Sequence, residues 1–386
     1  MSIGTRSFFT RLMKLAGASA LALAVTVTGC KKESNDSGGG TSASGGAKPL
    51  VVGFLYVGTR DDNGYNQAHA EAAAVVSGME GVKIKEVDGV KENQDAQTTM
   101  EAMVNNQGAK LIFATSFGYF DPHVKEIAKK YPAVTFLHAG GTLKDGDPSN
   151  LGTFFAYIDE LEFLCGMAAG AATKTNKIGY VAAKPVRPVL RDINAFELGA
   201  KSVNPKVTCT VIFTGDWFKP TDEANAVTNL QGQGIDVVSG HIDSPKVMIQ
   251  TADKLGMYSC GYHFNGAALS PKKYLTGAEW NWTPLYKKFV EDFKAGKPMP
   301  HNFNGTLRDG TVSLSAYGPE VSDESKKAID AVKSEMLKGG FKMYKGPLKD
   351  NTGAEKMAAG TSYGSDDGAV WGIDYFVEGV IGKPSN

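Results

Sequence analysis

The sequence predicts an α/β protein built from two doubly wound, Rossmann-like lobes with parallel sheets, joined by a hinge. Short apolar runs alternate with amphipathic helical stretches along the body of the chain, and Gly or Pro stands at most of the joins. This order of strand, helix and strand is typical of parallel βαβ units. The apolar runs lack a period of two, as expected for strands that helices cover on both faces.

Residues 1–29 have the three-part layout of an export signal. Three basic side chains, Arg6, Arg11 and Lys14, precede the apolar run "LAGASALALAVTV", and small residues follow. The run is too short to span a bilayer. It ends at "VTGC", which resembles the lipobox of bacterial lipoproteins, so Cys30 is expected to carry the lipid and to be the first mature residue. The alternative is a soluble secreted protein with an incidental cysteine.

The stretch 30–48 is polar and rich in Gly and Ser, which is typical of a flexible tether. We expect the lipid alone to hold the folded body at a membrane, because no later stretch is apolar enough to span one. The body from residue 49 to residue 386 is long enough for about two domains of ~150 residues each. We therefore expect a first lobe over 49–158 and a second lobe over 159–282.

The elements of the two lobes follow from the alternating pattern. In the first lobe we predict strands at 49–58, 82–87, 110–116, 133–140 and 150–158, and helices at 66–79, 96–107 and 122–132. In the second lobe we predict strands at 177–183, 207–214, 235–242, 257–264 and 273–282, and helices at 159–175, 190–203, 221–233 and 245–255.

The last hundred residues are harder to assign. They contain predicted helices at 284–296 and 323–339, and we expect part of 283–309 to join the first lobe and part of 310–386 to join the second. The Gly-rich tail, with "GAVWGIDYFVEGV", has no clear placement.

Charge and cysteine content exclude two classes of protein. The 386 residues hold 41 Lys and Arg against 41 Asp and Glu, which gives no electrostatic case for binding nucleic acid. Beyond the proposed lipid site, three widely spaced cysteines remain: Cys165, Cys209 and Cys260. An odd number at such spacing is no disulfide framework, so we expect three buried thiols, with a Cys209–Cys260 bridge as the less favoured alternative.

Functional side chains are expected where the strands end. In an open parallel sheet, ligands bind outside the carboxyl ends of the strands, because several loops converge only there. The candidate ligand-binding residues in such positions are Asp62, Tyr65, Asn66, Ser116, Phe117, Gly118, Tyr119, Trp217, Asp243, His263 and Trp282. We expect those of one lobe to face those of the other across a cleft.

Several of these residues also have a purely structural interpretation. Asp62 or Asn66 could cap the helix at 66–79, and Asp243 could cap the one at 245–255. Turn residues rather than apolar ones surround Trp217 in "TGDWFKP", which favours ligand stacking over a core position. His263 could be an interior histidine.

Trp282 has a similar ambiguity. Trp280 and Trp282 lie two residues apart and would share one face of an extended chain, so at least one of them is expected to pack in the interior.

Catalytic and metal-binding motifs are scarce. "GTSYG" (360–364) and "SPKK" (270–273) match short hydrolase patterns, but no predicted strand leads into the first and the second lacks its partner motifs, so we interpret both as chance. There is no P-loop, no G-x-G-x-x-G after a strand, no H-E-x-x-H and no C-x-x-C, and the six histidines are dispersed. We expect a protein that is not an enzyme and that has no metal and no cofactor.

The candidate residues suit a flat and largely neutral molecule. Each aromatic face gains ~0.5–1.5 kcal/mol per stacked partner beyond area burial, and a few carboxylates and amides can fix the orientation of the ligand. A purine base, with or without ribose, meets this description, because Asp accepts N–H or O–H groups and Asn or Ser complements the ring edge.

Several motifs together resemble one protein family. The segments "DDNGYNQAHAEA", "ATSFGYFDPHV", "AKKYPAVTFLHAGG", "IGYVAA", "NAFELGA" and "GIDVVSGHIDSP" are similar to the basic-membrane-protein family of type I periplasmic binding proteins, which includes purine nucleoside receptors of ABC importers. The resemblance implies that Asn66, Phe117 or Tyr119, Trp217 and Asp243 contact the ligand. Trp217 stands where Phe is usual in that family, which leaves a free nucleobase open beside a nucleoside.

The resemblance also implies a function. It predicts a monomeric, lipid-anchored protein of the cell envelope that closes by hinge motion around a purine nucleoside or nucleobase and delivers it to an ABC permease in the membrane. The alternatives are a sensor subunit that presents its ligand to a membrane receptor, and a binding protein for another small planar or sugar-like solute. A nucleoside hydrolase is disfavoured because no nucleophile or metal constellation is present.

Overall fold

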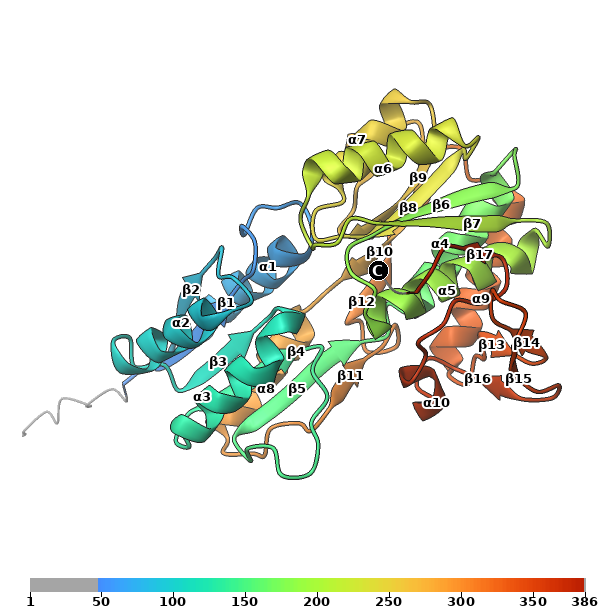
Figure 1. Cartoon of the computed structure of the whole chain (residues 1–386). Coiled ribbons are helices and arrows are strands. Elements are labelled where there is room, and N and C mark those ends of the chain that lie inside the picture. The colour runs from blue at the N-terminus through green and yellow to red at the C-terminus, as the bar shows by residue number, and fades with distance from the viewer. Residues whose placement is uncertain (1–47, 385–386) are drawn as a thin grey trace, which may run out of the picture. The chain divides into compact units, whose positions relative to one another are not determined.

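The computed structural model describes residues 48–384 (Figure 1). The export signal, Cys30 and almost all of the tether therefore lie outside the described residues. Among the residues that are described, none of the helices combines the length and the apolar character needed to cross a membrane.

The first sheet has six parallel strands in the order β11-β5-β4-β3-β1-β2. Its strands are β1 (Leu50–Leu55), β2 (Val82–Val87), β3 (Leu111–Ala114), β4 (Thr135–Ala139), β5 (Leu151–Ala156) and β11 (Phe303–Gly305). Its helices are α1 (Tyr65–Ser77), α2 (Gln94–Asn105), α3 (Lys125–Lys130) and α8 (Thr283–Lys294).

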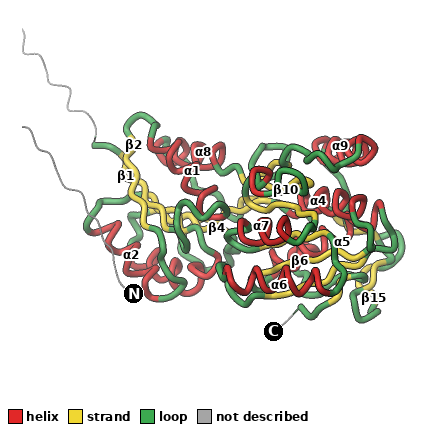
Figure 2. The backbone as a smooth tube through the Cα atoms, turned by 90° about the horizontal axis from the view of Figure 1, so that it is seen from above, coloured by secondary structure: helices red, strands yellow, loops and turns green. Residues whose placement is uncertain are grey.

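Helices cover both faces of this first sheet, as predicted from the apolar strands. Helices α1 and α8 pack together on one side and α2 with α3 on the other (Figures 1 and 2). Neighbouring residues of β1 belong to opposite cores: Phe54 packs with the aromatic cluster on the α1 side, and Leu55 packs on the α2 side. Burial on both faces explains why the apolar runs lack a period of two.

The second sheet has seven strands in the order β12-β10-β9-β8-β6-β7-β17, of which only β12 is antiparallel to its neighbour. Its strands are β6 (Lys177–Ala182), β7 (Thr208–Phe213), β8 (Val237–His241), β9 (Tyr258–His263), β10 (Tyr274–Trp280), β12 (Val312–Leu314) and β17 (Val380–Ile381). Its helices are α4 (Asp159–Ala172), α5 (Arg187–Val203), α6 (Pro220–Gly232), α7 (Lys246–Lys254) and α9 (Asp323–Lys338).

The chain passes between the two sheets three times, at 157–158, 281–282 and 306–311. After the second crossing, α8 packs beside α1, and β11 extends the first sheet next to β5. After the third, β12 pairs with β10. The predicted fold class, two doubly wound lobes with parallel sheets, is confirmed.

The C-terminal segment, which the sequence left unplaced, packs along α5. It contains two short antiparallel pairs, β13 (Tyr344–Lys345) with β16 (Ser362–Tyr363) and β14 (Leu348–Lys349) with β15 (Glu355–Met357), then α10 (Gly368–Trp371) and β17. The buried Asn194 of α5 holds this segment, because its amide donates to Tyr375 O at 2.9 Å and its Oδ1 accepts from Val377 N at 2.9 Å.

The predicted buried thiols are confirmed. Cys165, Cys209 and Cys260 are all buried and free. Cys209 lies in β7 and Cys260 in β9, and these strands are not neighbours in the sheet, so the alternative Cys209–Cys260 bridge does not form.

Helices α4 and α5 approach each other closely through glycine. A Cβ atom at Gly199 would lie 1.9 Å from Phe163 O, and one at Gly166 would lie 2.0 Å from Phe196 O. Backbone atoms cannot move aside as a flexible side chain can, so this crossing tolerates no larger residue.

We predict that Gly199→Ala lowers the free energy of unfolding by about 3 kcal/mol, because the added methyl group forces the two helices apart. Gly232→Ala in α6 is the matched control, since a Cβ atom there meets no other atom within 4 Å. Urea unfolding of the two variants measures the difference, and equal stability would contradict the close helix crossing.

Candidate ligand-binding site

A cavity lies between the carboxyl ends of the two sheets. Its empty volume is about 410 Å³, including space open to solvent. The lining residues are Tyr65, Ser116, Phe117, Ala139, Phe155, Val186, Pro188, Trp217, His241 and Asp243. They come from loops and strand ends of both lobes, so the cavity is closed only when the lobes stand together.

The structure brings some of the predicted site residues together in this lining and leaves others behind it. Tyr65, Ser116, Phe117, Trp217 and Asp243 line the cavity. Asp62, Asn66 and Gly118 support lining residues from behind. Tyr119, His263 and Trp282 are buried elsewhere.

Asp62 precedes Gly64, the N-cap residue of α1, and its carboxylate accepts hydrogen bonds from the first turn of the helix. Its Oδ1 accepts from Gly64 N and Gln67 N at 2.9 and 3.0 Å, and its Oδ2 accepts from Asn66 N at 3.0 Å and from Asn66 Nδ2 at 2.7 Å. Burial raises the pKa of the Asp62 carboxyl, although these hydrogen bonds oppose the rise. The geometry therefore supports a structural role for Asp62 at the start of α1. Asp62 also fixes the side chain of Asn66, which is fully buried.

The start of α1 also joins the two lobes. Tyr65 N donates to Asp243 O at 2.9 Å, and Ser244 Oγ donates to Asp62 O at 2.5 Å. The Tyr65 hydroxyl donates to Thr115 O at 2.5 Å, which ties the helix start to the loop after β3. The "DDNGYN" loop therefore positions Tyr65 in the cavity wall and contacts the second lobe directly.

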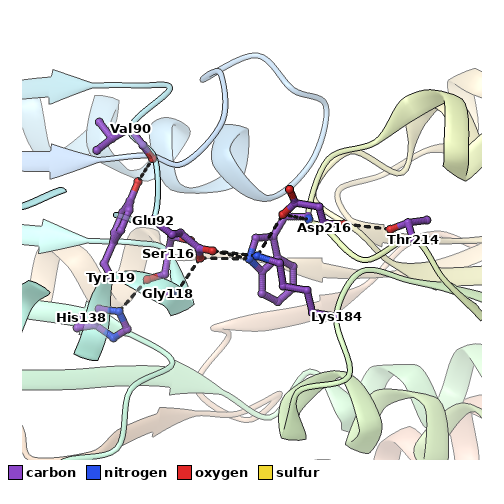
Figure 3. A network of polar contacts seen from close by, with 10 residues as sticks. Val90, Glu92, Ser116, Gly118, Tyr119, His138, Lys184, Thr214 and Asp216 are labelled. Atoms are coloured by element: carbon purple, nitrogen blue, oxygen red, sulfur yellow. Dashed lines mark hydrogen bonds and ion pairs between the residues drawn. The ribbon is translucent and has the colours of Figure 1, made fainter. Parts of the chain in front are cut away.

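A network around Glu92 bridges the cavity (Figure 3). Glu92 follows β2 in the first lobe, and its Oε1 accepts from Ser116 Oγ at 2.6 Å and from Gly118 N at 2.8 Å. From the second lobe, Trp217 Nε1 donates to Glu92 Oε1 at 3.1 Å, and Lys184 Nζ lies 3.0 Å from Oε2. One carboxylate thus holds donors of both lobes.

Sequence reasoning missed Glu92. It lies after a strand's carboxyl end, as the other candidates do, so the same rule applied to the loop after β2 would have found it. In "GVKENQD", however, it stands among other polar residues, and nothing local distinguishes it from a solvated side chain.

The same network keeps the loop after β3 in place. His138 is fully buried, and burial lowers its pKa to about 4, so the imidazole is neutral at physiological pH. Gly141 N donates to its Nδ1 at 3.0 Å, and Nε2 donates to Ser116 O at 2.8 Å.

Phe117 and Tyr119 differ in direction although they share one 3₁₀ turn, Phe117–Tyr119. Phe117 lines the cavity and is 39% exposed. Tyr119 is fully buried in the core of the first lobe, where its hydroxyl donates to Val90 O at 2.5 Å. Of the two alternatives, only Phe117 has a face available in the cavity.

His263 and Trp282 lie among other aromatic rings and not in the cavity wall. Trp280 Nε1 donates to His263 Nδ1 at 2.6 Å. The Trp282 ring is fully buried at the second crossing, stacked on Trp280 with centroids 4.6 Å apart and on His69 at 4.8 Å. The geometry therefore supports packing as the role of Trp282.

Asp243 is the carboxylate of the cavity wall. Its main chain is fixed at both ends, because its N–H donates to Trp217 O at 2.8 Å and its carbonyl accepts from Tyr65. Burial raises the pKa of Asp243, and the nearby carboxylates of Asp62 and Glu92 raise it further, while Asn66 and Lys184 oppose the rise. A ligand that donates hydrogen bonds to Asp243 would oppose this rise and favour the charged carboxylate.

Within residues 48–384 there is no group of His, Cys, Asp and Glu side chains arranged to hold a metal ion. Two aromatic faces on opposite lobes, a buried carboxylate and hydrogen-bonding groups at strand ends are the parts of a binding site. The fold and the site define a two-lobed solute-binding protein.

Comparison with known proteins identifies the family to which this chain belongs. The family model described as the PnrA-like substrate-binding protein of ABC transporters (Bmp) matches residues 50–345, and the chain belongs to this family. Proteins of this family bind a small-molecule solute and an ABC permease outside the cytoplasm, and they are not enzymes.

Relatives of the whole body are known. The chain is 33% identical over 336 residues to a purine-binding protein of Brucella abortus, covering 86% of this chain and 93% of that one. It is 30% identical over 351 residues to a putative ABC transporter glucose-binding protein of Haloferax volcanii, covering 91% and 84%. A solute-binding protein of an Aeropyrum pernix ABC transporter has the same fold, with a TM-score of 0.67 at 16% identity over 78% of this chain and 93% of that one.

Glu92 makes the contact between the lobes dependent on pH. Burial alone would raise the pKa of Glu92, but the hydrogen bonds from Ser116, Lys184 and Gly118 and the charge of Lys184 together lower it. A lowered pKa in the folded protein means that the stabilisation is present above the ordinary pKa of about 4.3 and is lost as the pH falls through the lowered value.

We predict that Glu92→Gln lowers the free energy of unfolding by about 1–3 kcal/mol at neutral pH, because the buried donors of both lobes lose a charged acceptor. The difference from the unmodified protein shrinks as the pH falls below about 4. Glu101→Gln is the control, since its pair with Lys130 is exposed. Urea unfolding at several pH values measures both; a pH-independent difference for Glu92→Gln would contradict the charge-based contact.

Proposed function

We propose that this protein is the lipid-anchored, monomeric substrate-binding component of an ABC importer, and that it traps a purine nucleoside or nucleobase between its lobes for delivery to the permease. The observation that carries the proposal is that one cavity is lined by an aromatic side chain from each lobe, Phe117 from the first and Trp217 from the second, and by the carboxylate of Asp243.

Trp217 is held in a fixed orientation when the two lobes are together. It is 9% exposed, its indole N–H is held by Glu92, and Lys184 Nζ lies 5.1 Å from the ring centroid. A fixed ring loses little conformational freedom on binding, and a planar ligand gains the stacking energy in full.

The carboxylate of Asp243 fixes the orientation of the stacked ligand. Asp243 accepts N–H groups at the edge of a ring that lies between the two aromatic faces, and it would be costly to bury against a ligand without donors. The purine-binding name of the Brucella relative supports this proposal, whereas the glucose-binding name of the Haloferax relative makes a sugar the alternative to test.

A thermal-shift panel of nucleobases, nucleosides, sugars and amino acids tests the ligand class. We expect purine compounds to raise the melting temperature. If only sugars or only amino acids do so, the aromatic-stacking proposal is wrong.

In the same panel, we predict that Trp217→Ala weakens purine binding by at least about tenfold, because it removes the larger aromatic face. The control is Phe218→Ala, which removes the adjacent but 55% exposed ring. Unchanged affinity in Trp217→Ala, with normal unfolding behaviour, would remove this residue from the site.

The lipid anchor at Cys30 rests on the sequence of residues 1–30. We predict that the full precursor, produced in an export-competent bacterium, partitions with the membrane fraction and that Cys30→Ser moves it to the soluble exported fraction, because the acyl chains supply the membrane affinity. Detergent-phase partitioning measures this. Equal partitioning of the two forms would exclude lipidation at Cys30.

A further inference from the structure

His241 is a residue of the cavity wall that neither the sequence motifs nor the proposed stacking explains. It is the last residue of β8, it lines the cavity next to Asp243, and its ring centroid lies 6.1 Å from that of Trp217. Only 7% of it is exposed.

Groups behind the cavity wall fix the orientation of this imidazole. His241 Nδ1 lies 2.7 Å from Asp192 Oδ2 of α5. The Tyr262 hydroxyl of β9 donates to the same carboxylate oxygen at 2.8 Å and lies 3.0 Å from His241 Nδ1. Asp192 and Tyr262 are themselves buried, so this arrangement belongs to the rigid part of the second lobe.

These contacts also fix which nitrogen carries the proton. A carboxylate is only an acceptor, so the short contact to Asp192 requires the hydrogen on Nδ1 of His241. In the neutral ring, the other nitrogen, Nε2, then has a free lone pair. Among the described residues no hydrogen bond involves this Nε2, and the ring edge that carries it points away from Asp192.

The cavity therefore offers two acceptors and few free donors. Asp243 is one acceptor and His241 Nε2 is the other. The candidate donors are already engaged: Lys184 Nζ pairs with Glu92 and with Asp216, and Ser116 Oγ donates to Glu92. Three further residues of the cavity lining, Phe155, Val186 and Pro188, are apolar.

A ligand suited to this wall must itself supply N–H groups on more than one edge. A free purine base has a ring N–H on its five-membered ring as well as donors on its six-membered ring, whereas a nucleoside has a sugar in place of the first. A ribose would also place hydroxyl groups, which need donors and acceptors alike, against apolar side chains.

We propose that the site is built for a free nucleobase: His241 Nε2 accepts the N–H of the five-membered ring, and Asp243 accepts a hydrogen bond from the opposite edge. Asp192 and Tyr262 are positioning residues that fix the orientation of the His241 ring and the hydrogen on its Nδ1. This inference rests on the proposed function and narrows it from purine compounds in general to bases with an unsubstituted five-membered ring.

Titration calorimetry with the purine base that binds most tightly, its 9-methyl derivative and its riboside tests the inference. We expect the base to bind at least about tenfold more tightly than either derivative, because each leaves a buried acceptor without its donor. The 9-methyl derivative adds little volume, so its loss of affinity reports the hydrogen bond more than the size of the pocket.

His241→Phe keeps an aromatic ring and removes the acceptor. In this variant we expect the affinity for the base to fall at least about tenfold, to that of the 9-methyl derivative, while binding of the derivative changes little. Phe218→Ala, with its exposed ring, is the control and should keep the discrimination between the two ligands.

Nuclear magnetic resonance of protein labelled with ¹⁵N-histidine tests the positioning role. We expect the Nε2 resonance of His241 to be that of an unprotonated nitrogen and to move when the base binds but not when the 9-methyl derivative binds. Asp192→Asn should allow the other tautomer and change this resonance in the free protein, which a merely structural role would not do.

The outcomes separate the inference from the proposed function. If the riboside binds as tightly as the base, or if His241→Phe weakens the base and its 9-methyl derivative equally, the inference is wrong and the proposed function stands. If no purine compound binds and a sugar does, both are wrong.

Discussion

The arrangement of the site depends on the contacts made by the carboxylate of Glu92. It accepts hydrogen bonds from Ser116 and Gly118 of its own lobe and meets Trp217 and Lys184 of the other. Charged acceptors of this kind form stronger hydrogen bonds than neutral ones. Glu92 thus holds both the loop after β3, which carries Phe117, and the indole of Trp217 after β7. One residue that does not itself line the cavity therefore positions the two aromatic rings relative to each other.

The second constraint is the aromatic packing where the chain crosses between sheets. Trp282 stacks on Trp280 and on His69, and His69 Nδ1 lies 2.6 Å from the Tyr286 hydroxyl. Rings of α1, of α8 and of the crossing segment thus form one continuous stack, which gives the crossing a dense core instead of a loose linker. Closure of such a protein around a ligand would proceed by movement of whole lobes about this core, since close-packed interiors do not deform gradually.

The order of strands and helices could be predicted because short, largely apolar or β-branched runs alternate with amphipathic stretches, and the cavity position followed from the rule that ligands bind at the carboxyl ends of parallel strands. Of the residues that the rule indicated, Tyr65, Ser116, Phe117, Trp217 and Asp243 line the cavity. It could not separate Phe117 from Tyr119, since the direction of each ring in a 3₁₀ turn is decided by the core that forms around it. It also missed Glu92, whose partners Trp217 and Lys184 are distant in sequence and meet it only when the lobes come together.

Gly64 connects the "DDNGYN" motif to the closed arrangement of the lobes. A Cβ atom at this position would lie 1.8 Å from Asp243 O, which is the oxygen that accepts the hydrogen bond from Tyr65 N. Any side chain there would push the helix start of the first lobe away from the loop after β8, and with it the wall that contains both Tyr65 and Asp243. The glycine is therefore required by the approach of the second lobe, not by the local conformation of the loop, whose φ of −170° is open to every residue. The motif thus encodes the contact between the two lobes beside the cavity.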